Sequence, residues 1–228
     1  LGRRAPLLTE GPEAVRLIEL DSFLLTPDGL QRLAMDARLP WPVMAVDATF
    51  PVAVGEHGLE QALERLGQEA VEHVERGAGV LVVSDVGVDV DRCRVPILLA
   101  VGAVHQRLVT AGVRTRVSIV AETDELRTTH DAATLLGYGA DALVPRLVLE
   151  TIAHLADEDR IGGDNPTSSE AQQRYRVALE DGVLKIMSKM GISVLDSYRS
   201  AQIFEALGLD AEVIDRCFTR TMSVLGVE

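Results

Sequence analysis

Short runs of β-branched and other apolar residues recur along the 228-residue chain, each separated from the next by a longer amphipathic stretch. This alternation is typical of βα units arranged around a parallel sheet. We therefore predict an α/β fold, partly barrel-like, with a parallel sheet of at least four strands and covering helices. The predicted strands are 43–47, 79–84, 116–120 and 141–144, with a fifth candidate at 16–20.

The stretches between these runs carry helical signals. From Leu59 to Val74 apolar residues recur on one face of a helix, and Gly77 stands where that helix would end. Pro96 fits the first turn of a second helix, and Thr128 or Thr129 can cap a third. The helices predicted to cover the sheet are 58–76, 96 to 108 or 109, and 128 or 129 to 136.

A polar segment at 157–169 contains glycine and proline and is predicted to be a mobile surface loop. It divides a βα-repeat domain, 1–156, from a helical C-terminal section of the same domain, 170–228. Gly191, Gly208 and Asp210 separate the last of its predicted helices. Its predicted helices are 170–179, 183–190, 195–207 and 211–222.

Charge and composition argue against several classes of function. The 35 acidic and 22 basic residues give a net charge of -13, which is unfavourable for binding nucleic acid or an anionic membrane. The longest apolar stretch, 95–104, is too short for a spanning helix. No signal peptide is recognised, so we expect a cytoplasmic protein. Cys93 and Cys217 are isolated and predict neither a metal site nor a disulfide framework.

Polar side chains follow three consecutive predicted strands. Asp47, Asp85 and Glu122, with Ser84 and Thr123 beside them, stand at or just beyond the carboxyl ends, where βα barrels carry their catalytic residues. These carboxylates are therefore candidate catalytic groups. The alternative is that they cap the following helices or line a solvated rim.

Two further groups of residues are candidate ligand sites. The turn at 137–142 is rich in glycine and small residues and could approach a phosphate, but it precedes a strand, so a helix cap and turn is the competing interpretation. Lys185 and Lys189, four residues apart, are the only lysines, and Arg199 follows them. This cationic group could face an anionic ligand or an acidic partner, or simply be solvated.

Four motifs resemble, in the same order, the central domain of the glutamate synthase large subunit. The longest spans 182–209 and includes Gly-Val-Leu-Lys-Ile-Met-Ser-Lys-Met-Gly-Ile-Ser and Ile-Phe-Glu-Ala-Leu-Gly-Leu. The others are Ser-Asp-x-Gly at 84–87, Leu-Leu-Ala-Val-Gly-Ala-Val-His at 98–105, and Leu-Gly-Tyr-Gly-Ala-Asp-Ala at 136–142. The likeness runs from about residue 15 to the end, and the chain is similar to the later part of that domain.

The resemblance implies a parent enzyme that makes glutamate from glutamine and 2-oxoglutarate with a reduced electron donor. Such enzymes combine a glutaminase, this central domain, an FMN-binding barrel with a 3Fe-4S cluster, and a β-helix. The chain has no counterpart of the nucleophilic cysteine, the cluster cysteines or the flavin barrel. It is therefore expected to be a scaffold and coupling domain without a cofactor or catalytic residue of its own.

The partners implied by the resemblance are the glutaminase and FMN-barrel domains. The expected interdomain interface is Lys185, Lys189, Tyr198, Arg199 and Phe204, with apolar surface in excess that would cause self-association of the isolated chain. The chain departs from its relatives at Ser200, where they tend to carry glycine. The alternative function is a free-standing small βα enzyme or phosphate-binding module that uses the strand-end carboxylates.

Overall fold

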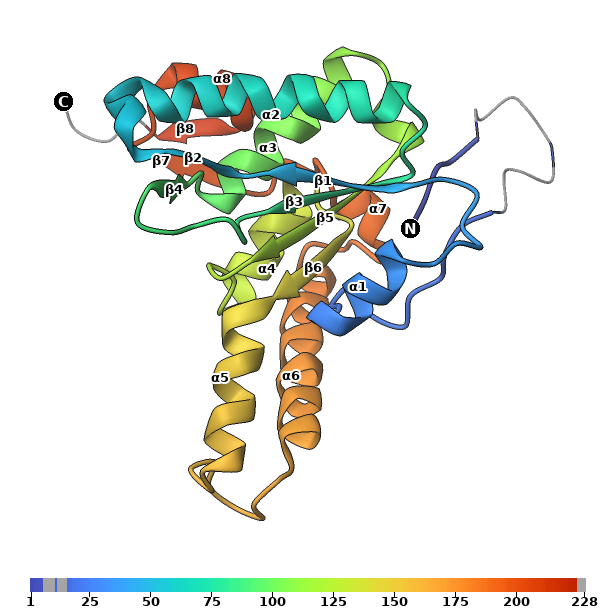
Figure 1. Cartoon of the computed structure of the whole chain (residues 1–228), viewed down its shortest axis with the longest axis vertical. Coiled ribbons are helices and arrows are strands. Elements are labelled where there is room, and N and C mark those ends of the chain that lie inside the picture. Colours follow the sequence, from blue (N-terminus) through green and yellow to red (C-terminus); the bar gives the residue numbers. More distant parts are fainter. Residues whose placement is uncertain (6–10, 12–15, 225–228) are drawn as a thin grey trace.

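A four-stranded parallel sheet forms the centre of the molecule (Figure 1). The computed structural model describes residues 1–5, 11 and 16–224. In the sheet the strands stand in the order β1-β3-β5-β6, so each strand pairs with the next one supplied by the βα repeat. The α/β prediction is confirmed. The strands are β1 (Val43–Asp47), β3 (Val80–Ser84), β5 (Ser118–Thr123) and β6 (Ala142–Pro145).

Both faces of this sheet are buried. Along β3 the side chains alternate, so Val80 and Val82 enter one hydrophobic cluster while Leu81 and Val83 enter another. All four are between 0% and 6% exposed. Burial on both faces explains why these strands appear in the sequence as continuous apolar runs.

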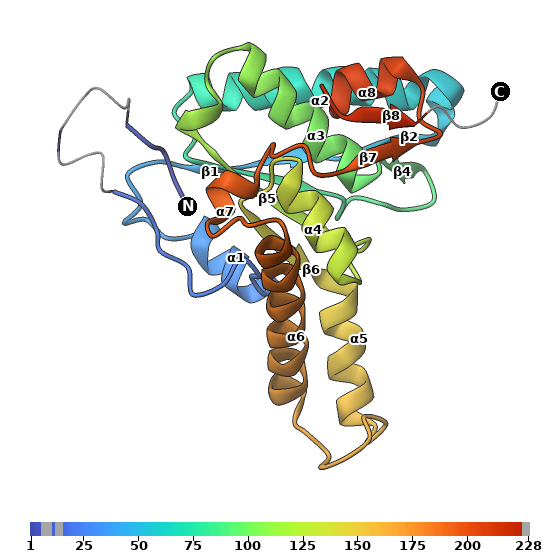
Figure 2. The same ribbon diagram turned by 180° about the vertical axis from the view of Figure 1, so that it is seen from behind.

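Helices from the βα repeat cover one face. The apolar stripe of α2 (Gly58–Glu75), including Leu66 and Ala70, packs there beside Val101 and Val104 of α3 (Ile97–Thr110). The short C-terminal helix α8 (Ala211–Cys217) lies against α3 (Figure 2). The third repeat helix is α4 (Thr129–Gly137). The predicted repeat helices are thus present, with ends within two residues of those expected.

The opposite face is covered by the N-terminal part of the chain. Leu30 of α1 (Pro27–Ala34) and Trp41, which precedes β1, pack on Val80 and Val82. The expected strand at 16–20 is wrong, because the edge of β6 is satisfied by the next segment: Leu143 donates to the carbonyl of Phe23 at 2.8 Å and accepts from Leu25 at 2.8 Å. Ile18 and Leu20 instead pack into this second core.

A helical hairpin extends away from the sheet (Figures 1 and 2). It consists of α5 (Arg146–Asp157), which was not predicted, and α6 (Ser168–Lys189). The predicted break between 179 and 183 is absent, because Gly182 lies inside α6, where a Cβ atom would come within 2.6 Å of Thr129 on α4. In the described parts of the chain, no helix is both long and apolar enough to cross a bilayer.

The C-terminal section departs most from prediction. The expected helix at 195–207 stops at Tyr198, because Ser200 and Gln202 adopt positive φ values of 60° and 56° that a helix cannot accommodate. The helix predicted to reach 222 ends at 217. The observed elements are α7 (Leu195–Tyr198), β7 (Glu205–Leu207), α8 (Ala211–Cys217) and β8 (Met222–Val224).

Short elements complete the fold. An antiparallel ribbon of two strands, unpredicted because each strand has only three residues, extends the chain beyond β1 and β3. Single-turn helices link larger elements. These elements are β2 (Thr49–Pro51), β4 (Arg92–Arg94), η2 (Val52–His57) and η3 (Arg114–Arg116).

The predicted loop is the turn at the far end of the α5–α6 hairpin, and we expect it to be the first internal site of proteolysis. Arg160 lies there with its side chain 65% exposed. Limited trypsin digestion should therefore cut first after Arg160, since loop backbone with few buried contacts opens most easily. An Arg160→Gln variant is the control and should resist that cut. Initial cleavage after Arg114 or Arg116, next to β5, would contradict the expectation.

Candidate functional site

The three candidate carboxylates stand at the carboxyl edge of the sheet, as predicted, but they do not form one cluster. Asp47, Ser84 and Glu122 occupy matched positions on adjacent strands and share one face. Asp85 is one residue further and lies on the other face, with Thr123. The edge therefore holds two separate groups of polar contacts.

Asp85 is held in a buried ion pair. Its side chain is fully buried, and Oδ1 accepts a hydrogen bond from Nη2 of Arg146 at 2.8 Å. Oδ2 accepts from the Thr123 hydroxyl at 2.7 Å. Arg146 also pairs with Asp124 at 3.0 Å. A charge so enclosed needs its partner, since removing one member of a buried pair costs about 3–5 kcal/mol.

Asp47 and Glu122 also form polar contacts within the chain. Oδ2 of Asp47 lies 2.6 Å from Nη2 of Arg92, and Oδ1 accepts from the Thr49 hydroxyl at 2.6 Å. Oε2 of Glu122 accepts from the Ser84 hydroxyl at 2.6 Å. Each candidate carboxylate thus has a partner within the chain. Among the described residues, no three His, Cys, Asp or Glu side chains gather in a way that could hold a metal ion.

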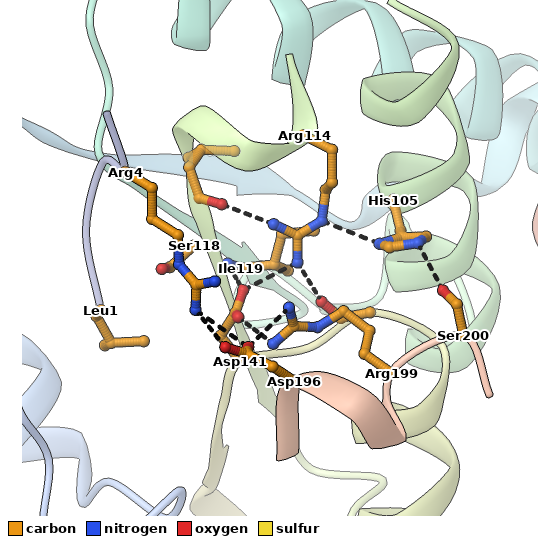
Figure 3. Close-up of polar contacts among 12 residues, drawn as sticks. Leu1, Arg4, His105, Arg114, Ser118, Ile119, Asp141, Asp196, Arg199 and Ser200 are labelled. Carbon is orange, nitrogen blue, oxygen red and sulfur yellow. Dashed lines mark hydrogen bonds and ion pairs between the residues drawn. The ribbon is translucent and has the colours of Figure 1, made fainter. Parts of the chain in front are cut away.

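A second charged cluster lies at the opposite end of the sheet and centres on Asp141 (Figure 3). Oδ2 of Asp141 accepts from Nη2 of Arg114 at 2.9 Å and from the backbone N–H of Ile119 at 2.8 Å. Oδ1 accepts from Nη2 of Arg199. All three charged side chains are only 11–15% exposed. Two arginines thus share one buried carboxylate.

The sequence interpretation included Arg199 but missed its partners. Asp141 precedes a buried apolar strand, and a charge in that position is a signal for a paired carboxylate. Arg114 could not be paired from sequence alone, because 27 positions separate it from Asp141. The contact depends on the way α3 returns the chain to β5.

A histidine extends this cluster and resembles a catalytic pair without being one. Nε of Arg114 donates to Nδ1 of His105 at 2.9 Å, so the other ring nitrogen carries the proton. Nε2 of His105 therefore donates to the Ser200 hydroxyl, 3.2 Å away. Burial, and then the charges of Arg114 and Arg199, lower the pKa of His105 to about 3. His105 cannot take a proton from Ser200 in this arrangement.

The glycine-bearing turn after α4 serves packing. The N–H groups of Tyr138, Gly139 and Ala140 donate to carbonyls within α4, so they are not available to a phosphate. A Cβ atom at residue 137 would lie 2.6 Å from the Phe204 ring. Gly139 has φ +130°, and a Cβ atom there would lie 2.6 Å from the His105 ring. The turn makes room for side chains of its own chain, which fits a helix end.

The predicted interface residues occupy different environments. Tyr198 is 0% exposed, so its placement on a docking surface is wrong: it packs in the core, edge-on to Phe204 at 6.4 Å. Phe204 is half-buried and stacks on Tyr138 at 5.7 Å. Arg199 belongs to the Asp141 cluster. Lys185 and Lys189 are exposed, and their docking role stays a prediction.

His105 should make folding stability depend on pH. Its pKa is about 3 in the folded chain and about 6.5 when unfolded, so the unfolded chain binds the proton first. This contribution is fully present above pH 6.5 and is lost toward pH 3, at about 1.4 kcal/mol per pH unit. In His105→Gln, the free energy of unfolding measured in urea should fall less between pH 6 and pH 4 than it does in the unmodified chain.

The control is His154→Gln, because His154 has a side chain that is 68% exposed. Its pH profile should follow that of the unmodified chain. Parallel profiles for His105→Gln and the unmodified chain would contradict the assignment of a neutral, buried His105.

Solved structures share the fold. The sulfite-bound flavocytochrome b2 superposes with a TM-score of 0.51, covering 78% of this chain and 38% of that one at 13% identity. The recombinant flavin-binding domain of the baker's yeast enzyme gives the same TM-score and also covers 78% of this chain. At this identity the likeness shows the fold alone.

Several relatives are more similar to this chain in sequence than these solved structures are. The chain is 38% identical to glutamate synthase [NADH] of Schizosaccharomyces pombe, across 98% of this chain and 11% of that protein. It is 38% identical to the glutamate synthase [NADPH] large chain of Bacillus subtilis, and 39% to the chloroplastic ferredoxin-dependent enzyme of Oryza sativa, across 99% of this chain and 14% of each relative. The chain thus spans a small part of these relatives' length. Residues 1–210 match the glutamate synthase central domain, and the chain belongs to that family.

Proposed function

We propose that this chain acts as a scaffold and coupling segment of a glutamate synthase and carries no catalytic group of its own. The observation that supports this most is the pairing of Asp47, Asp85 and Glu122 within the chain. In βα barrels the carboxyl edge of the sheet carries the chemistry. Here its carboxylates hold strands and loops together.

The face opposite the helices also supports a structural role. In a closed βα barrel this face is the interior, filled by side chains from all the strands. In this chain Trp41, together with Leu30 of α1, covers it. The corresponding face of this four-stranded sheet is therefore already occupied by the chain's own N-terminal region.

The cysteines do not fit an iron–sulfur cluster. Clusters are held by several thiolates. Cys93 is exposed, whereas Cys217 is buried, and burial raises the pKa of its thiol to about 11. We therefore assign the 3Fe-4S cluster expected in the parent enzyme to another domain. By the resemblance we assign FMN there too, together with the glutaminase and the reduction that forms glutamate from glutamine and 2-oxoglutarate.

We assign docking on those domains to the exposed side chains around the C-terminal end of α6. Leu184, Met190 and Val194 are 59%, 52% and 53% exposed, and Lys185 and Lys189 are exposed as well. We call these five residues the α6 surface. Exposed apolar side chains rimmed by charge are typical of interaction sites, where the charges set orientation and encounter rate.

The purified chain should bind neither flavin nor iron. Dialysis against FMN followed by absorption spectroscopy, and iron analysis of protein expressed with added iron, should both give less than about 0.1 equivalent per chain, as expected where no ligand set exists. A yellow protein that keeps one equivalent of FMN after dialysis would contradict the proposal.

The docking role can be tested in a hybrid enzyme. This chain would replace the matching segment of the Bacillus subtilis large chain, and Leu184→Ser with Met190→Ser would be introduced together. Loss of interfacial apolar contacts should lower glutamine-dependent glutamate formation at least about tenfold, since truncation at a docking centre costs more than about 1.4 kcal/mol. Glutamine hydrolysis measured separately reports on the partner domain.

Val177→Ser provides the matched control, because Val177 is 44% exposed on the same helix, outside the α6 surface. It should leave glutamate formation within about twofold, as expected for a surface change. Urea unfolding of each isolated variant establishes that the fold persists. A double serine variant that unfolds normally and retains full coupled activity would refute docking through the α6 surface.

A further inference from the structure

Five side chains from four segments close a ring around the start of β6 (Figure 3). Asp141 binds both Arg114 and Arg199. Arg114 donates to His105, and His105 donates to Ser200. Since Arg199 and Ser200 are consecutive in the sequence, the backbone between them completes the circuit. We call these five residues the Asp141 ring.

The ring holds a segment whose backbone is strained. Ser200 has φ 60° and Gln202 has φ 56°, in the left-handed region that serine and glutamine rarely adopt. The backbone adds one further anchor, from the N–H of Ser200 to the carbonyl of Gly137 at 2.8 Å. Such conformations persist only where surrounding contacts over-determine them. The side chains of the ring supply part of those contacts, and the packing of Phe204 against Tyr138 and Tyr198 supplies others.

The element beyond this segment depends on few contacts. Among the described residues strand β7 pairs with β8 alone, in a two-stranded parallel sheet; Ala206 packs in the core, whereas Leu207 and Met222 are 72% and 66% exposed. Parallel sheets are normally covered on both faces, and two strands alone are marginally stable. The segment 199–207 therefore joins the stable sheet to a weakly supported strand.

We propose that the Asp141 ring is a latch for residues 199–207. With the ring closed, this segment and β7 are fixed against α4 and the end of the sheet. When the ring opens, the strained residues relax and the segment moves away while the central sheet stays folded. The latch is a property of this chain alone, so the inference stands or falls independently of the scaffold function.

Two side chains of the segment take part in the latch: Arg199 binds Asp141, and Ser200 closes the ring at His105. Alanine at this position would remove the hydroxyl and keep the backbone strain. Glycine would remove the hydroxyl but also relieve the strain, because glycine adopts positive φ readily.

Hydrogen–deuterium exchange of the 228-residue chain tests the latch. In Ser200→Ala, amides of 199–207 should exchange about tenfold faster while those of β3 and β5 stay unchanged, because local opening is separate from global unfolding. Ser200→Gly should lie within about threefold of the unmodified chain. Ser197→Ala, an exposed serine on α7 outside the ring, is the matched control and should change nothing.

A double variant tests whether Ser200 acts through His105. If it does, the double variant His105→Gln with Ser200→Ala should exchange no faster than the faster of the two single variants. The effects of substitutions at two coupled residues do not add. The proposal is overturned if Ser200→Ala exchanges like Ser197→Ala. It is also overturned if exchange in β3 and β5 rises in parallel with that of 199–207.

Discussion

Burial of the parallel sheet on both faces is the constraint on which the rest of the structure depends. Each fully buried Val or Leu of β3 contributes about 1.5–3 kcal/mol, and this strand contacts a hydrophobic cluster on either side. One cluster is built from helices of the βα repeat. The other requires Trp41, α1 and the N-terminal segment. The N-terminal region is therefore part of the core.

Charges at the two ends of the sheet hold its loops in place. At the carboxyl edge, Arg146 and Arg92 neutralise Asp85 and Asp47. At the other edge, Arg114 and Arg199 converge on Asp141. These pairs lie where βα proteins commonly place ligands or join their loops, and here they link loops at both ends of the sheet through contacts within the chain. This arrangement supports the proposed structural role.

Sequence reasoning located the sheet well because buried strands leave a local signal. The runs around Val82 and Val120 could be recognised without knowing what covers them. The Asp141 ring could not be recognised, because its members are brought together by long-range topology and depend on the tautomer of His105. The strand-end carboxylates were placed at the right edge, whereas their arginine partners follow only from loop paths.

The C-terminal errors have one physical source. Residues 195–207 have a helical apolar pattern, yet Tyr198 and Phe204 are drawn into an aromatic cluster with Tyr138. That packing requires positive φ at Ser200 and Gln202, which no periodicity reveals. Tertiary contacts outweigh helix propensity there, since propensity differences among ordinary residues are below about 1 kcal/mol. The same contacts explain why Tyr198 is unavailable for docking.

The most direct test of the central claim is the turnover number of the Bacillus subtilis hybrid carrying Asp47→Asn and Glu122→Gln. Both substitutions remove a carboxylate charge but keep its shape. If the chain is a scaffold, kcat should stay within about twofold of the parent hybrid, whereas removing a general acid or base lowers the rate about 10²–10⁴-fold. A loss of that size, in a hybrid with unchanged thermal stability, would contradict the account.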